Sequence, residues 1–154
     1  MNMRSNRIEV SIGSELKYLE LIKTITDGIT SFMRFDDDTA YWIGMSVGES
    51  VNNAIRHGNR LVQDKSVEIC FEIAPEQLDI FVRDQGGGFS VNDVPNPLDP
   101  ENVMKPSGRG VFFICSFMDE VELQLLPDGD GMEVHMAKRV FANQVTAQVV
   151  STVI

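Results

Sequence analysis

The chain has 154 residues, a length that suits one domain, and 43% of them are hydrophobic, enough for a core without disulfides. The net charge of −10 disfavours nucleic acid as a partner, because nucleic acid is bound largely by neutralising phosphates with Lys and Arg. No stretch approaches the ~20 apolar residues of a membrane span, and the N-terminus lacks the apolar core of a signal peptide. We therefore expect a cytoplasmic protein with no membrane partner. Cys70 and Cys115 stand in apolar runs without metal-ligand spacing, so both are expected in the core.

The N-terminal half is expected to form one strand and two helices. Residues 7–12 alternate in polarity as a strand does, and residues 14–34 carry apolar side chains at helical spacing, with Ser14 as a candidate N-cap. A second helix is expected from about 38 to 57. Three aspartates open it, which suits the positive end of a helix dipole, and Gly58 ends it.

The C-terminal half is expected to contain four strands and one helix. The strands are placed at 65–74, 77–83, 120–126 and 131–139, and the helix at 109–118. Before that helix comes a long segment with four of the chain's six prolines, the composition of a functional lid or a disordered loop. This order is not the strict alternation of a doubly wound sheet, so an α+β fold is predicted. Its sheet is expected to be mixed but mostly antiparallel, with helices on one face.

One domain is expected over residues 1–141. The tail 142–154 carries no charge and is rich in β-branched residues. It is compatible with an additional strand, a dimer contact or an aggregation-prone extension.

The second helix carries a carboxylate and an amide on one face. Glu49 and Asn53 are four residues apart and therefore project about one turn from each other. An amide oxygen together with phosphate oxygens suits Mg²⁺, and a nearby glutamate could take a proton from an attacking hydroxyl. Taken alone, the pattern is equally that of an exposed polar helix face.

Two glycine-rich segments complete the pattern. Asp84 at a strand end, followed by glycines, could accept a hydrogen bond from the exocyclic amine of adenine. In the second segment, Ser107, Gly108, Arg109 and Gly110 stand directly before a helix, where free backbone N–H groups bind phosphate. A plain turn and an ordinary helix entry are the alternatives for these segments.

Together the three segments resemble the Bergerat-fold ATPases, the group of gyrase, Hsp90, histidine kinases and MutL. The resemblance covers about residues 7–140 and rests on Glu49-x-x-x-Asn53, Asp84-x-Gly86-x-Gly88 and the segment from Ser107 to Gly110. The Met118-Asp119-Glu120-Val121 run most resembles the anti-sigma-factor serine kinases of bacterial partner-switching systems.

The resemblance implies a two-layer α/β sandwich that binds ATP and Mg²⁺. It implies that Glu49 is the catalytic base, that Asn53 is the Mg²⁺ ligand and that Asp84 holds the adenine amine. Gly86 and Gly88 would shape the base pocket, Gly108 and Gly110 would wrap the phosphates, and residues 90–107 would form a lid. Some members carry an arginine where Pro106 stands here, which leaves Arg109 as a candidate contact for the γ-phosphate.

The implied function is that of a homodimeric serine kinase that phosphorylates an anti-sigma antagonist protein and otherwise holds a sigma factor inactive. Two alternatives stay open on sequence alone. One is an ATP-binding regulatory module without phosphotransfer, although such a module would not need Glu49. The other is a detached histidine-kinase catalytic domain, which is disfavoured because no helical hairpin with an acceptor histidine precedes residue 7.

Overall fold

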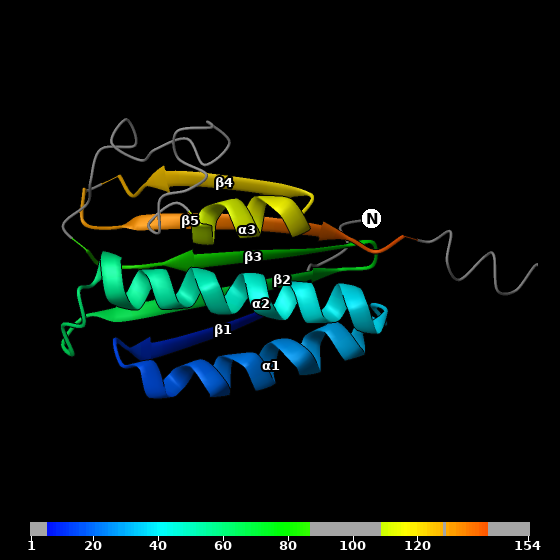
Figure 1. Ribbon diagram of the computed structural model, residues 1–154, viewed down its shortest axis with the longest axis horizontal. Coiled ribbons are helices and arrows are strands. Elements are labelled where there is room, and N and C mark those ends of the chain that lie inside the picture. Colours follow the sequence, from blue (N-terminus) through cyan, green and yellow to red (C-terminus); the bar gives the residue numbers. More distant parts are fainter. Residues whose placement is uncertain (1–5, 87–108, 128, 142–154) are drawn as a thin grey trace, which may run out of the picture.

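The computed structural model describes residues 6–86, 109–127 and 129–141 (Figure 1). The elements in chain order are β1 (Asn6–Gly13), α1 (Leu19–Phe32), α2 (Asp37–Asn53), β2 (Ser66–Ala74), β3 (Gln77–Arg83), α3 (Arg109–Phe117), β4 (Glu120–Leu125) and β5 (Met132–Arg139). The predicted strand at 77–83 is confirmed at both ends, and the other elements begin and end close to their predicted bounds, apart from the first helix and the end of the second. The predicted lid at 90–107 and the tail 142–154 lie outside the described residues.

The five strands form one sheet in the order β1-β2-β3-β5-β4, and every pairing between described strands is antiparallel. The register places apolar side chains opposite one another on one face. One such row across all five strands consists of Val10, Ile69, Val82, Val134 and Leu123. A sheet with one apolar face must bury that face against another layer.

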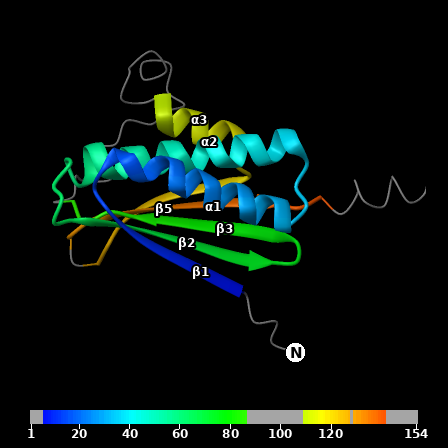
Figure 2. The same ribbon diagram turned by 90° about the horizontal axis from the view of Figure 1, so that it is seen from below.

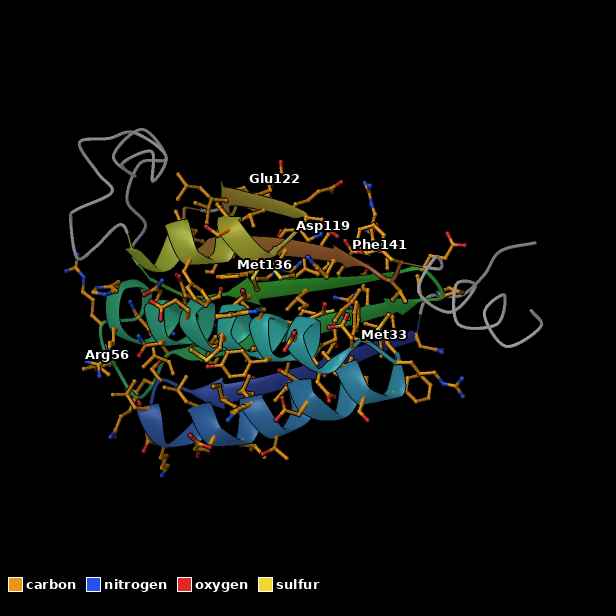
Figure 3. The ribbon with its side chains drawn as sticks, turned by 45° about the vertical axis from the view of Figure 1, so that its right-hand side comes forward. Met33, Arg56, Asp119, Glu122, Met136 and Phe141 are labelled. Atoms are coloured by element: carbon orange, nitrogen blue, oxygen red, sulfur yellow. The ribbon has the colours of Figure 1, made fainter. Side chains whose placement is uncertain are left out.

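The helices supply that layer, and Figure 2 shows α1, α2 and α3 on the same side of the sheet. The core between the layers is apolar. Ile22 of α1 and Ile43 of α2 are fully buried, and so is Met136 of β5, which is labelled in Figure 3. The expectation of an α+β fold with helices on one face is thus confirmed.

The start of α2 follows the prediction. The side chain of Asp36 accepts a hydrogen bond of 2.8 Å from the Thr39 N–H and so caps the helix. Asp37 and Asp38 occupy the first turn, where their negative charge interacts favourably with the helix dipole.

The prediction for the start of α1 was wrong. A short 3-10 helix spans Leu16–Tyr18, and α1 begins only at Leu19, with Tyr18 in the N-cap position. Ser14 does not cap a helix, because its hydroxyl donates a 2.6 Å hydrogen bond to the carbonyl of Lys65. That bond joins the end of β1 to the loop before β2, a contact between residues far apart in the sequence.

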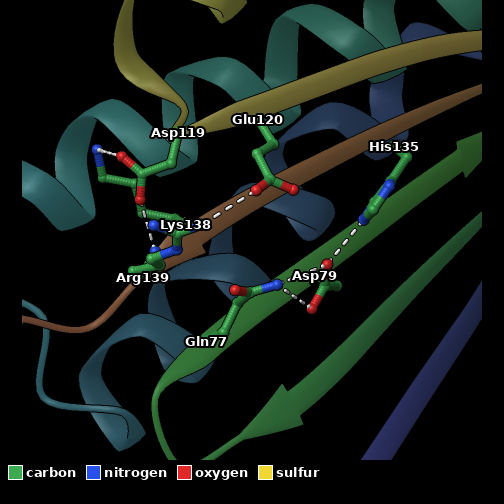
Figure 4. Close-up of polar contacts among 7 residues, drawn as sticks. All are labelled: Gln77, Asp79, Asp119, Glu120, His135, Lys138 and Arg139. Carbon is green, nitrogen blue, oxygen red and sulfur yellow. Dashed lines mark hydrogen bonds and ion pairs between the residues drawn. The ribbon is translucent and has the colours of Figure 1, made fainter.

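The opposite face of the sheet is polar and carries no helix among the described residues (Figures 2 and 4). On this face Cys70 is buried beneath Arg7, whose Nε lies 2.9 Å from its sulfur. His135 stacks on Phe81 and its Nε2 lies 2.7 Å from Asp79 Oδ1. The expectation that both cysteines are buried holds for Cys70 only, because Cys115 is half-buried.

The Met118-Asp119-Glu120-Val121 run joins α3 to β4. The Asp119 carboxylate accepts hydrogen bonds from the Lys138 side chain and from the Arg139 backbone N–H, and Arg139 also pairs with Glu120 (Figure 4). Lys138 donates in addition to the carbonyl of Phe117 at the end of α3, where a cation is favoured. The run therefore holds the end of α3 and the start of β4 against β5.

Candidate functional site

The C-terminal end of α2 changes its helical geometry beside the predicted metal ligand. The α-helix ends at Asn53 and a π-helical turn follows at Ala54–Gly58, closed by a 2.8 Å hydrogen bond from the Asn59 N–H to the Ala54 carbonyl. Turns of this type are rare and occur often at functional sites. Arg56 projects from this turn into solvent, on the side away from the core (Figure 3).

Glu49 and Asn53 meet the start of α3. Both side chains are half-buried on α2, and Gly110 lies in the first turn of α3. A β-carbon added at Gly110 would lie 3.0 Å from Asn53 Nδ2 and would overlap Glu49 Oε1. Glycine is therefore the residue that lets α3 begin directly beside the carboxylate and the amide.

Asp84 follows β3 and is 9% exposed. Its Oδ1 accepts hydrogen bonds from the backbone N–H groups of Gly86, at 3.0 Å, and Met132, at 3.2 Å. Burial raises the pKa of the Asp84 carboxyl above its ordinary value, while these two hydrogen bonds and the charge of Lys65 act in the opposite direction. The Asp84 carboxyl group is thus held by backbone N–H groups in a poorly solvated place.

Three glycines surround Asp84. A β-carbon at Gly58 would overlap the Asp84 carboxylate, one at Gly86 would overlap the carbonyl of Gly58, and one at Gly131 would overlap the Asp84 carbonyl. Gly131 also has a φ of +149°, which L side chains rarely adopt. Sequence reasoning predicted Gly86 but missed Gly58, which was interpreted as a helix stop, and Gly131, which was placed at the start of a strand.

Asn59 is a second residue that sequence reasoning missed. It is fully buried, and its side chain donates to Ser14 Oγ and the Ser66 carbonyl and accepts a 2.7 Å bond from the Gln85 N–H. Asn59 therefore ties the end of the π-helical turn to β2 and to the segment that carries Asp84. Its position directly after a helix-ending glycine was the available signal.

The structure thus brings predicted residues into two groups about one helical turn apart. Asn53 stands with Glu49 and Gly110 before the π-helical turn, and Asp84 stands with Gly86 and Gly58 at its end. Arg109 is described only as the first residue of α3. Gly88, Ser107 and Gly108 lie outside the described residues.

The donor set tests which metal could be held here. Among the described residues no group of three or more His, Cys, Asp or Glu side chains is placed to hold a metal ion. A cation at Asn53 would therefore take its other ligands from a bound molecule and water. This suits Mg²⁺, which keeps several waters and is bound through few protein oxygens plus phosphates.

The described part of the chain has no helix with the length and apolar character needed to cross a bilayer.

Comparisons with known proteins find relatives over most of the chain. Curated relatives include "Serine-protein kinase RsbW" of Bacillus licheniformis, 27% identical over 144 residues that cover 90% of this chain and 88% of the relative. A protein of the same name from Bacillus cereus (strain Q1) is 27% identical over 152 residues, covering 94% and 92%.

A solved structure shows the same fold. It contains the RsbU and RsbW domains of Rv1364c from Mycobacterium tuberculosis and matches with a TM-score of 0.64 at 12% identity, over 88% of this chain. This chain spans 32% of the length of that solved chain. Residues 14–138 match the family described as the histidine kinase-like ATPase domain, and because this match covers most of the sequence, the chain belongs to that family.

Proposed function

We propose that this chain is an ATP-dependent protein serine kinase that acts as an anti-sigma factor in a partner-switching system. The observation that carries the proposal is the arrangement along the end of α2. A carboxylate and an amide stand beside Gly110, and a buried aspartate within a shell of glycines stands one turn away. The shared name of the relatives, serine-protein kinase, supports the reaction class.

Asp84 would recognise the adenine base. Its Oδ1 is occupied by two backbone N–H groups, and Oδ2 lies on the side of Gly58, where a side chain would overlap it. A carboxylate only accepts hydrogen bonds, which matches the exocyclic amine of adenine. Gly86 and Gly88 would leave room for the flat base.

Asn53 would hold Mg²⁺, and the start of α3 would bind the phosphates. The backbone N–H groups at a helix N-terminus favour anions, and Gly108 and Gly110 would let the phosphates approach that backbone. Ser107 and Arg109 stand in the same segment and would add a hydroxyl and a positive charge. When bound, the metal would neutralise charge on the phosphates.

Glu49 would be the general base of the transfer. The oxygen of an acceptor serine forms a bond to the γ-phosphorus, the bond from that phosphorus to the bridging oxygen of ADP breaks, and the serine proton moves to the Glu49 carboxylate. Exclusion of water from the site favours the protein hydroxyl over hydrolysis.

The partners that we propose are an anti-sigma antagonist protein as acceptor and a sigma factor as the inhibited target, with the chain acting as a cytoplasmic homodimer. The curated relatives align over nearly their full lengths, which supports the transfer of the whole role rather than of nucleotide binding alone.

The test is phosphotransfer from γ-labelled ATP to a candidate antagonist protein. We expect acid-stable label on a serine, and we expect Glu49→Gln to abolish transfer while nucleotide binding persists. Nucleotide binding without transfer to the antagonist would instead indicate a regulatory module. Acid-labile label would indicate histidine-kinase chemistry.

The metal assignment has its own matched control. Asn53→Ala should abolish Mg²⁺-dependent nucleotide binding, whereas Asn52→Ala should preserve it. Asn52 is the same residue type one position earlier, and its side chain accepts a 3.0 Å hydrogen bond from Arg56. Equal nucleotide affinity of the two variants would contradict a metal site at Asn53.

A further inference from the structure

A groove runs between the two long helices on their outer side. Figure 2 shows α1 and α2 next to each other on the sheet, and the groove between them has a volume of about 280 Å³. Its lining includes Lys23 and Asp27 from α1 and Gly44, Gly48 and Glu49 from α2. None of these side chains except Glu49 belongs to the nucleotide site proposed above.

The glycines in this groove are not required by the packing of the protein itself. Among the described residues, a β-carbon at Gly48 would have no atom within 4 Å, and one at Gly44 would only make an ordinary contact of 3.5 Å with Asp27. Glycine inside a helix lowers helix stability relative to residues with side chains. Gly44 is buried and Gly48 is half-buried, so it is Gly48 that sacrifices helix stability for a bare stretch of helix backbone, a feature that allows another chain to approach closely.

Glu49 forms the boundary between this groove and the nucleotide site. Its carboxylate lines the groove and at the same time lies next to Gly110 of α3. A hydroxyl placed in the groove would thus reach the carboxylate from one side while the phosphates at the start of α3 lie on the other. This is the arrangement that a base between acceptor and donor requires.

We propose that the α1–α2 groove docks the serine-bearing segment of the acceptor protein, an inference that rests on the proposed kinase function. The groove is lined by the acidic Glu20, Asp27 and Glu49 and by one basic side chain, Lys23, so it fits a segment with basic residues beside the serine. Tyr41 also lines the groove and is 56% exposed, which offers an apolar contact to the same segment.

The test uses fluorescent peptides with a single serine, flanked either by arginines or by glutamates, and the protein loaded with Mg-ADP. Anisotropy should show that the arginine peptide binds at least about tenfold more tightly. Gly48→Leu should weaken this binding by about tenfold or more, because the new side chain fills the groove floor. Replacing Glu20 and Asp27 together by lysine should reverse the preference between the peptides.

Gly28→Leu is the matched control. Like Gly48, Gly28 lies inside a helix and has no atom of the described residues within 4 Å of an added β-carbon, but it does not line the groove. Both leucine variants should unfold at or above the wild-type temperature, and only Gly48→Leu should weaken peptide binding. Absence of peptide binding, equal binding by both variants, or a preference unchanged by the lysine replacements would each overturn the docking site.

This design separates the groove from the kinase proposal, because peptide binding is measured without phosphotransfer. If Gly48→Leu does not change phosphotransfer to the antagonist protein, the docking proposal is contradicted and the kinase proposal is unaffected. If the peptide binds in the groove but no labelled phosphate reaches the antagonist protein, the docking proposal is supported and the kinase proposal is contradicted.

Discussion

Asp84 shows how one buried carboxylate can lower the stability of the folded protein. Because burial raises the pKa of its carboxyl, the folded protein binds a proton more tightly there than the unfolded chain does. The stability that Asp84 contributes is therefore fully present below the unfolded pKa and is lost as pH rises through the folded pKa. At neutral pH the ionised side chain destabilises the protein without its ligand.

Asp84→Asn is therefore expected to raise the melting temperature of the ligand-free protein at neutral pH. The amide oxygen can still accept from Gly86 and Met132, so the local backbone should persist. The gain over wild type should be small near pH 4 and grow as pH rises through the folded pKa. Melting curves across this pH range measure it, and a variant less stable than wild type at neutral pH would contradict the argument.

The same substitution, Asp84→Asn, should weaken the binding of ATP. Removal of the buried carboxylate that accepts from the adenine amine should lower the affinity for ATP by roughly ten- to a hundredfold. Because an amide also donates, the preference for ATP over GTP should fall, since guanine presents a carbonyl in place of the amine. Titration calorimetry with both nucleotides measures this effect, and an unchanged preference would remove Asp84 from base recognition.

At the scale of elements, the sequence predicts regular structure well and tertiary exceptions poorly. The apolar alternation of β3 and the aspartates before α2 are local signals, and both predictions are confirmed. The single helix predicted from 38 to 57 divides at Asn53, because apolar periodicity does not distinguish a π-helical turn from the α-helix that it continues. The lost N-cap at Ser14 has a related cause, since its partner Lys65 is 51 positions away.

In the candidate site too, local patterns were predictable from the sequence and long-range contacts were not. Glu49 and Asn53 share a helix face, which the sequence shows directly, and the structure places Gly110 beside both. The contacts of Gly58 and Gly131 with Asp84 join segments that are distant in the sequence. No regular sequence spacing predicts such contacts, so the glycines around Asp84 could be identified only from the structure.

Within α2, two buried hydroxyls point to a testable weakness. Ser46 and Ser50 are 0% and 2% exposed, and neither Oγ has a hydrogen-bond partner in the described part of the chain. Burial of an unsatisfied hydroxyl costs about 1–3 kcal/mol, and alanine is the better helix former. Ser46→Ala should therefore increase the unfolding free energy by about 1 kcal/mol, measured by urea denaturation. A loss of stability would show that the hydroxyl has a partner.

At the scale of the whole molecule, an aromatic cluster links the proposed phosphate site to the helix layer. Trp42, the chain's single tryptophan, stacks on Phe117 of α3 at 4.0 Å between ring centroids and also contacts Phe113. Gly110 lies in the first turn of the same helix, beside Glu49. A ligand that binds at the start of α3 therefore acts on a helix whose other end rests on the fluorophore.

Mg-ADP should accordingly change the intensity or wavelength of tryptophan emission, with a dependence on concentration that saturates. Asn53→Ala should remove the change, whereas Asn52→Ala should retain it. Trp42→Phe should remove the signal without removing nucleotide binding, which calorimetry measures separately. Emission that stays constant while calorimetry shows binding would mean that α3 does not respond to the nucleotide.

Metal and nucleotide should stabilise the protein only together, because Asn53 and the phosphates are each incomplete as a site for the cation. A ligand that binds the folded state alone stabilises it by about 2.7 kcal/mol at a hundredfold excess over Kd. For a domain of this size that corresponds to a rise in melting temperature of roughly 5–10 °C. Removal of Mg²⁺ with EDTA should abolish most of the rise, and Asn53→Ala should abolish the part that depends on Mg²⁺. A full rise with ATP in EDTA would show that the nucleotide is held without the cation, and the role assigned to Asn53 would then have to be given up.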